Sequence, residues 1–420
     1  MTALGMEHVT SRREMIRFFD GYSAERKEEL DERKTKRPLV KSHLLEILDS
    51  VSERGPDGLV NIFERRGLGL KRIDDDLYQA RSQSGDLVGF LEPLRPRLIA
   101  LYSNWDASSL GALVRNLVLR SPEIDHVWLS GLTFNVLWEV VTRLSHRNRF
   151  ARLVFTHDSV YEVDGIPQAA ADAEEEASDG EEQDPSDDVH VIAERRAARF
   201  QLVDRVRVVS EKLAQLQQTY SPLYAISQLR FPSPIGRGGH DFYDNGKVTN
   251  CSESFRDHRS HLLFVLRIYE EMLRRTEEQA WYGVKTSVAV PREFRRIVGA
   301  PLVIQFAEPL EPRVFDYWIE STFGRQRNRF RLWGHPIRLG PTKVHVYGLD
   351  RHLWHPLFLE LTARGCVAII PDRTCGNTIH RLVTNIQRFI DPGAKAYLGD
   401  QPYAAMVRDS SRDIQYVDAE

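Results

Sequence analysis

The stretch KSHLLEILDSVSERGPDGLVNIFERRGLGLKRIDDDLYQARSQSGDLVGFLEPLRPRLIALY (residues 41–102) decides our interpretation of the fold. Apolar residues recur in it at helical spacing, as in Leu44, Ile47, Leu48 and Val51. This spacing predicts three short helices, over residues 43–53, 59–66 and 70–82. Because Gly67-Leu68-Gly69 between the last two is a tight glycine turn, we expect those two helices to form a helix-turn-helix.

Two apolar runs after the third helix, residues 87–91 and 97–102, predict a β-hairpin whose turn contains Pro93-Leu94-Arg95-Pro96. Three helices and a hairpin in this order resemble the winged-helix domains of prokaryotic transcription regulators, here over residues 38–103. The resemblance implies that the third helix enters the major groove of duplex DNA and that the hairpin contacts phosphates. It assigns these contacts to Lys71, Arg72, Arg95 and Arg97.

Some features weaken this assignment. Asp74, Asp75 and Asp76 follow on the same predicted helix, and carboxylates near a polyanion oppose binding. The alternatives are a winged helix that serves dimerisation or another protein contact, and a different small helical fold. The preceding segment, residues 1–37, is predicted to be a charged helical arm. The arm carries an apolar stripe formed by Met15, Phe18, Phe19 and Tyr22. We interpret this stripe either as a homodimer contact or as part of a simple arm.

The composition is that of a globular protein with two or three domains, with 420 residues and a net charge of −3. No apolar run reaches the roughly 18 residues of a membrane span, so no membrane contact is expected. The N-terminus lacks the apolar core of a signal peptide, and the three cysteines have no metal-ligand spacing. We therefore expect a cytoplasmic protein with free thiols, no cofactor and no metal.

An acidic segment, residues 167–190, interrupts the chain. Between Asp172 and Asp188 there are ten acidic residues and no basic ones, so the rest of the chain carries a net charge of +7. Such a composition cannot bury a core, and we interpret the segment as a disordered insertion. It is either a solvated linker or an acidic tract that competes with nucleic acid for a basic surface.

Strands alternate with helices on both sides of this insertion. In residues 104–166, helices are predicted over 107–120 and 134–144 and strands over 125–130 and 151–156. This alternation predicts βαβ units and a largely parallel sheet.

Residues 191–298 are predicted to hold helices and a polar hairpin around Asn245-Gly246, with Phe242 opposite Thr249. The polar cluster there has three interpretations. It is a site for a small anionic ligand, a divalent-metal site in which Asp241 or Asp257 joins the histidines, or a network whose charges pair with one another. The proposed ligand contacts are Arg237, His240, Lys247, Arg256, His258, Arg259 and His261.

Residues 299–420 read as strand, helix, two strands, helix (353–364) and strand, the βαββαβ order of a ferredoxin-like module. The predicted fold class is therefore α/β (α+β): an N-terminal winged helix followed by a mixed α/β region that ends in this module.

Basic residues alternate with aromatic ones at the start of a strand in this module. That pattern suits phosphate pairing with base stacking, which gives RNA or single-strand binding as an alternative function; the other interpretation is a solvated basic loop. The residues concerned are Arg325, Arg327, Arg329, Phe330, Arg331 and Trp333.

A second candidate site follows the strand at 366–371. The turn into the next helix carries Arg373, Asn377, Thr378 and Arg381, and free N–H groups at a helix start bind anions. Cys375 and Arg381 also match the Cys-x5-Arg spacing of cysteine phosphatases, which gives a phosphoryl hydrolase as another alternative. An ordinary helix cap is the remaining interpretation.

The layout of a winged helix before a larger α/β region resembles archaeal ligand-sensing regulators. It implies a DNA-binding transcription regulator in which a small anionic ligand alters the spacing of paired winged helices. Enzyme activity is not expected, apart from the Cys375 alternative.

Overall fold

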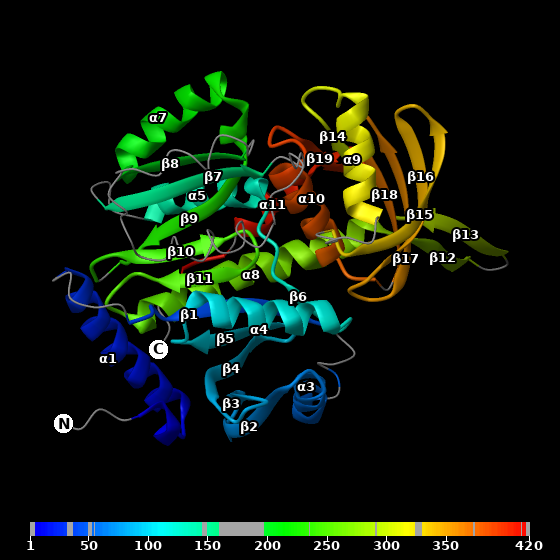
Figure 1. Ribbon diagram of the computed structural model, residues 1–420. Coiled ribbons are helices and arrows are strands. Elements are labelled where there is room, and N and C mark those ends of the chain that lie inside the picture. The colour runs from blue at the N-terminus through cyan, green and yellow to red at the C-terminus, as the bar shows by residue number, and fades with distance from the viewer. Residues whose placement is uncertain are drawn as a thin grey trace.

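The computed structural model describes residues 5–31, 37–48, 53, 55–144, 149–158, 197–234, 236–289, 292–323, 330–372, 374–412 and 414–416. The chain has a mixed α/β fold of the α+β class, with two large sheets and helices around them (Figure 1). The predicted acidic insertion lies outside the described residues. None of the described helices is long and apolar enough to cross a membrane.

The first sheet has the strand order β2-β3-β4-β5-β1-β11-β10-β9-β7-β8, with β6 beside β1. All its described pairs are antiparallel, so the predicted parallel sheet is wrong. Because β1 pairs with both β5 and β11, segments on both sides of the acidic insertion share this sheet. Its strands are β1 (Lys41–Ile47), β2 (Leu68–Asp74), β3 (Leu77–Ser82), β4 (Leu87–Arg95), β5 (Leu98–Ser103), β6 (Ile124–His126), β7 (Phe150–Asp158), β8 (Ala197–Arg205), β9 (Ile226–Pro232), β10 (Gly239–Tyr243) and β11 (Lys247–Asn250).

Two of the three helices predicted in residues 41–102 are strands. Residues 41–47 form β1, in which every residue is buried, and a strand buried on both faces has an apolar run that mimics a helix. Residues 68–82 form the β2–β3 hairpin, whose turn holds Asp76 at a φ of 53°. The second predicted helix exists as α3 (Gly55–Glu64), and the predicted hairpin exists as β4–β5. The described elements are therefore not the three helices of a winged helix.

Helices cover the first sheet. The helix at 107–120 is confirmed as α4 (Ala107–Arg120) and the next is α5 (Gly131–Leu144); the others are α1 (Arg12–Asp31), α7 (Val206–Thr219), α8 (Phe255–Ala280) and α11 (Tyr403–Ser411). The stripe predicted as a homodimer contact faces this chain's own core. Phe19 packs on Phe90 and Phe255, with ring centroids 5.8 and 4.8 Å apart.

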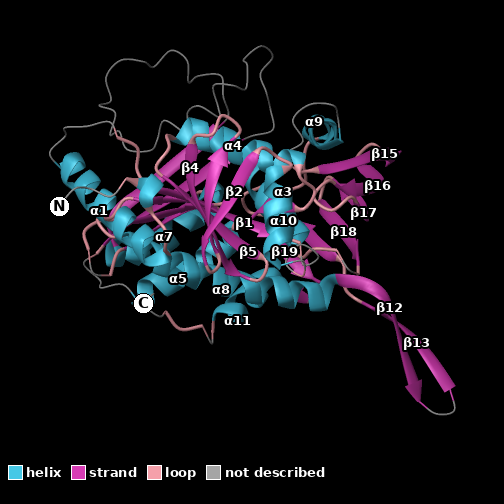
Figure 2. Cartoon of the chain, turned by 90° about the horizontal axis from the view of Figure 1, so that it is seen from below, coloured by secondary structure: helices cyan, strands magenta, loops and turns pink. Residues whose placement is uncertain are grey.

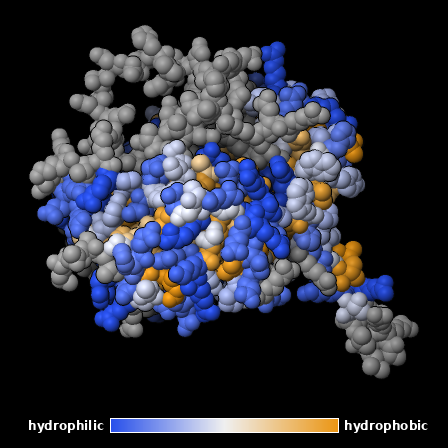
Figure 3. Space-filling view, turned by 60° about the horizontal axis from the view of Figure 1, so that its bottom comes forward, coloured by the Kyte–Doolittle hydropathy of each residue, from blue (hydrophilic) through white to orange (hydrophobic). Residues whose placement is uncertain are grey.

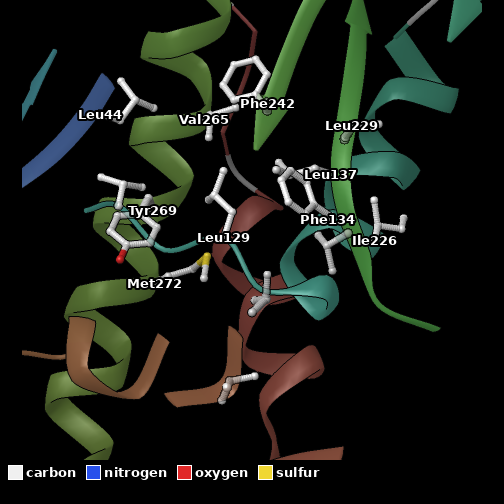
Figure 4. Packing of buried hydrophobic residues seen from close by; sticks show 14 of the residues in the cluster. Leu44, Leu129, Phe134, Leu137, Ile226, Leu229, Phe242, Val265, Tyr269 and Met272 are labelled. Carbon is white, nitrogen blue, oxygen red and sulfur yellow. The ribbon is translucent and has the colours of Figure 1, made fainter. Parts of the chain in front are cut away.

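Helix α8 runs through the middle of the main hydrophobic core. Its buried side chains include Val265, Tyr269 and Met272, which lie beside Leu129 and Phe242 from the first sheet's side (Figure 4). Ser254 caps its start by accepting a hydrogen bond from the Asp257 N–H at 3.1 Å, as its sequence position predicts. The same apolar cluster continues into the second sheet, so α8 joins the two halves.

The second sheet has the order β15-β16-β17-β18-β14-β19-β20, and the β12–β13 hairpin joins it through β18. The predicted helix at 353–364 is instead β17, so the ferredoxin-like order is wrong. Leu357, Leu359 and Leu361 alternate there with polar or half-buried residues, as in a strand with one buried face. The elements are β12 (Trp281–Ala289), β13 (Arg292–Val298), β14 (Leu302–Gln305), α9 (Pro312–Phe323), β15 (Leu332–Gly340), β16 (Lys343–Asp350), β17 (His355–Thr362), β18 (Gly365–Pro371), α10 (Asn377–Phe389), β19 (Lys395–Leu398) and β20 (Gln401–Pro402).

Candidate functional site

One face of the second sheet carries exposed aromatic side chains. Trp333 on β15 and Tyr347 on β16 are 61% and 72% exposed. Tyr347 is paired with His335 on β15 and with Phe358 on β17, so these side chains point to one side of the sheet, as does Trp333 two residues before His335. The rings of Tyr347 and Phe358 meet edge to face, with centroids 5.2 Å apart. We call Trp333, His335, Tyr347 and Phe358 the aromatic face.

The opposite side of these strands belongs to the core. Val346 of β16 and Leu359 of β17 are buried in the same cluster as Phe315 and Trp318 of α9. Helix α9 therefore covers one side of the sheet (Figure 1), and the aromatic face is the side that it leaves open.

The β12–β13 hairpin extends the aromatic face. Pro371 at the end of β18 is paired with Tyr282 of β12, and by strand alternation both lie on the side of Phe358. Val284, two residues further, is paired with Ile297, and both are exposed. The hairpin projects from the body of the protein (Figure 2), and a hydrophobic patch lies beside hydrophilic atoms at its base (Figure 3).

Cationic side chains flank the aromatic face. Arg295 is exposed and paired with Thr286 on the same side of the projecting hairpin as Val284. Lys343 is on the same side of β16 as Tyr347, and its Nζ lies 2.9 Å from Glu360. Proteins that bind single-stranded nucleic acid combine aromatic rings, on which the bases stack, with cations that pair with the phosphates.

Only part of the basic and aromatic run predicted at 325–333 reaches this face. Arg325, Arg327 and Arg329 lie outside the described residues. Phe330 is buried, and Arg331 is buried with its guanidinium donating to the carbonyl of Ile124 at 3.1 Å. Trp333 is the described residue of that run that is free to stack.

The residues assigned to duplex DNA do not share a surface. Lys71 and Arg72 are exposed neighbours on β2, so they point to opposite sides of a strand. Arg95 and Arg97 instead pair with α8: Arg95 Nε donates to Glu270 at 2.7 Å, and Arg97 donates to Glu277 at 2.8 Å. The placement of these four residues gives no support to a recognition helix.

A cavity of about 770 Å³ lies between the β4–β5 turn and α8. Its lining includes Arg95, Arg97 and Glu277, together with Arg267, for which no hydrogen bond or ion pair is found within the described part of the chain. An arginine that lines a cavity can bind an anion. The small anionic ligand therefore stays a prediction, but this cavity is not one of the places where the sequence predicted it.

Behind this cavity lies a polar group in which Glu46 and Cys375 are fully buried and Arg97 is mostly buried. Arg97 donates to Glu46 of β1 and, at 3.0 Å, to the sulfur of Cys375, whose thiol donates to Glu46 Oε1 at 2.9 Å. Burial raises the pKa of Glu46 to about 7, and burial with the nearby Glu46 carboxylate raises the pKa of the Cys375 thiol well above its ordinary value.

A second set of buried ion pairs adjoins this group. Arg381 is bonded to Asp125 and, at 2.6 Å, to Asp350, and Arg331 lies 3.0 Å from Asp125. Although burial alone would raise the pKa of Asp125, Arg331 and Arg381 hold it well below its ordinary value. Cysteine phosphatases need a thiol of lowered pKa and a free arginine. The raised pKa of Cys375 and the carboxylate partners of Arg381 therefore do not support that alternative.

The other anion contacts predicted near Cys375 are also engaged internally. Asn377 accepts a hydrogen bond from the Tyr269 hydroxyl and donates to the His126 carbonyl, and Thr378 donates to Asp350. Arg373 lies outside the described residues.

The polar hairpin exists, but Phe242 is paired with Val248, one residue away from the predicted register. Three residues, not two, form its turn, as the strand ends at Tyr243 and Lys247 show. This longer loop shifts the pairing by one position.

The polar residues predicted around this hairpin do not converge on one ligand. His240, His258 and His261 form a buried ring cluster, while Asp241 and Asp257 pair elsewhere, with Arg230 and Ser233. Burial lowers the pKa of all three histidines. The cations point to separate partners or to solvent: Arg259 donates to Glu92, Lys247 lies over Tyr243, Arg237 lies near Glu253, and Arg256 is exposed.

Several residues of these sites were missed in the sequence. Glu46 was assigned to a helix, although a single acid inside an apolar strand is itself a signal of a buried partner. His352 and Asp350 lie in a stretch next to the wrongly predicted helix. Tyr347 and Phe358 become neighbours of Trp333 only through strand pairing.

Comparison with known proteins gives one family. A family model described as MJECL33-like protein matches residues 4–404, a span that includes the aromatic face and the buried charged residues. No curated protein and no solved structure matches the chain.

Proposed function

The chain belongs to the MJECL33-like protein family, and on that premise we propose that it binds single-stranded nucleic acid across the aromatic face. The observation that carries this proposal is the exposure of Trp333 and Tyr347 on one open sheet face, where α9 covers only the other side. Successive bases stack on such rings, and each stacked base contributes about 1–3 kcal/mol by alanine substitution.

Phosphates would be met by the flanking cations. Arg295 on the projecting hairpin and Lys343 on β16 lie on the same side of the strands as the rings. Because phosphate contacts release counterions, binding weakens as salt concentration increases. We further propose a cytoplasmic location, since the three cysteines are free thiols.

Duplex-DNA binding and transcription regulation stay a prediction. The segment expected to enter the major groove is the β2–β3 hairpin, which leaves this prediction without its supporting helix. It has its own test: Lys71→Glu with Arg72→Glu removes duplex binding if those residues carry it.

The experiment measures fluorescence anisotropy of labelled single-stranded and duplex 20-nucleotide probes, at two salt concentrations. Trp333→Ala and Tyr347→Ala are each expected to weaken single-strand binding at least about fivefold, the lower end of the stacking range. Tyr224→Ala, an exposed aromatic residue near the first sheet, is the control and keeps full affinity. Equal losses in all three variants, or no single-strand binding by the full chain, would refute the proposal.

A further inference from the structure

Three buried donor atoms of different chemistry converge from distant parts of the chain. They belong to Glu46 on β1, His352 in the turn after β16 and Cys375 before α10, and all lie within 4.8 Å of one another. All three side chains are buried, at the junction of the two sheets.

Several polar atoms in this group have no hydrogen-bond partner within the part of the chain that the structure describes. Neither ring nitrogen of His352 forms a hydrogen bond among the described residues, and the same holds for Oε2 of Glu46. His352 and Glu46 are fully buried, and buried polar atoms are nearly always satisfied because an unsatisfied one costs free energy. Unsatisfied atoms on two adjacent side chains therefore indicate a ligand between them.

We propose that Glu46, His352 and Cys375 bind a zinc ion. Thiolate sulfur, imidazole nitrogen and carboxylate oxygen are the donors that zinc takes in proteins, and three protein ligands leave one of four positions for water. On binding, the Cys375 thiol releases its proton to solvent and the sulfur bonds to the ion. No redox change is involved.

The surrounding charges fit a divalent cation. Glu277 pairs with Arg97 at 2.8 Å, and Arg97 bonds to Glu46 and Cys375. With the thiol ionised, Glu46, Glu277 and Cys375 carry three negative charges against the one positive charge of Arg97, so a divalent ion restores neutrality. The adjacent aspartates are already matched by Arg331 and Arg381.

The site also adjoins a cavity. Arg97 and Glu277 line the cavity of about 770 Å³. Arg97 donates hydrogen bonds to Glu46 and Cys375, and Glu277 pairs with Arg97 and accepts a hydrogen bond from the backbone N–H of Gly376, next to Cys375. They would act as outer partners that orient the ligands, because outer hydrogen bonds fix ligand geometry in metal sites.

The test loads the full chain with Zn²⁺, removes excess by dialysis and measures the metal content, and repeats the loading with Co²⁺. We expect one ion per chain, and a near-ultraviolet sulfur-to-cobalt charge-transfer band. Cys375→Ser should abolish the band and His352→Gln should lower the metal content, whereas Cys366→Ser, a buried cysteine outside the group, should retain both.

Absence of stoichiometric metal in the unsubstituted chain would overturn the proposal, whether or not the variants fold. A charge-transfer band that survives in Cys375→Ser would also overturn it. Nucleic-acid binding is measured separately, so its failure does not affect this result.

Discussion

At the scale of single residues, Arg381 is a fully buried cation held by two carboxylates. A buried pair adds little stability compared with an apolar replacement of both partners, but removal of one partner leaves an uncompensated charge. The spacing of Arg381 from Cys375 suggested catalysis, whereas its contacts show a structural role between the two sheets.

Arg381→Met is therefore expected to lower the free energy of unfolding by about 3–5 kcal/mol, because Asp350 loses its cation in the core. Urea titration followed by circular dichroism measures this change. Arg338→Met is the matched control: its partner Asp316 is exposed, and such pairs contribute at most about 1 kcal/mol. Similar losses in both variants would contradict this account of Arg381.

The buried histidine cluster gives a prediction for pH. Burial lowers the pKa of His261 from 6.5 to about 3. Below pH 6.5, His261 therefore binds a proton in the unfolded chain but not in the folded chain. Stability therefore falls as pH decreases from 6.5 toward 3, by about 1.4 kcal/mol per pH unit for each such imidazole.

His261→Phe should reduce the slope of the unfolding free energy against pH by the contribution of one imidazole. A phenyl ring can occupy the same ring cluster but does not bind a proton. The measurement is the free energy of unfolding in urea at pH 6 and pH 5. An unchanged slope would show that His261 is protonated in the folded protein.

At the scale of elements, the β10–β11 turn depends on a glycine. Gly246 has a φ of +74°, and a Cβ there would lie 2.7 Å from the Leu44 carbonyl oxygen and 2.8 Å from that of Val127. Both oxygens belong to backbone in or beside β1 and β6, so neither can move without disturbing the sheet.

Gly246→Ala should destabilise the chain by more than about 1 kcal/mol, from the left-handed backbone and the backbone contacts together. Gly340→Ala at the end of β15 is the control, because a Cβ there meets nothing within 4 Å. Thermal unfolding compares the two, and equal melting temperatures would contradict the steric argument.

Helices with one apolar stripe were predictable from sequence. Leu110, Val114 and Leu117 lie buried on α4 at the spacing that predicted it, and Ser254 caps α8 as expected. The strands of residues 41–82 were not predictable in this way. Every residue of β1 is buried, so its apolar run carries no period of two. Asp74 ends β2, and Asp75 and Asp76 form the turn that follows it, rather than a helix surface.

At the scale of the whole molecule, the sites depend on pairings that a sequence does not display. Trp333 was identified from its neighbours in sequence, but Tyr347 and Phe358 join it only through the order of β15, β16 and β17. The Glu46–Cys375 contact spans 329 positions of the chain. Local spacing rules for metal ligands and nucleophiles cannot detect such a group, because its members share neither a helix nor a loop.

The position of β1 has a consequence for synthesis of the protein. Its Lys41 is paired with Thr249, about two hundred residues later in the chain. As the polypeptide leaves the ribosome, the edge of β1 that pairs with β11 therefore stays unpaired until most of the first sheet has been translated. Such long-range pairing slows folding and leaves strand edges open to aggregation, so the nascent chain is a natural client for chaperones.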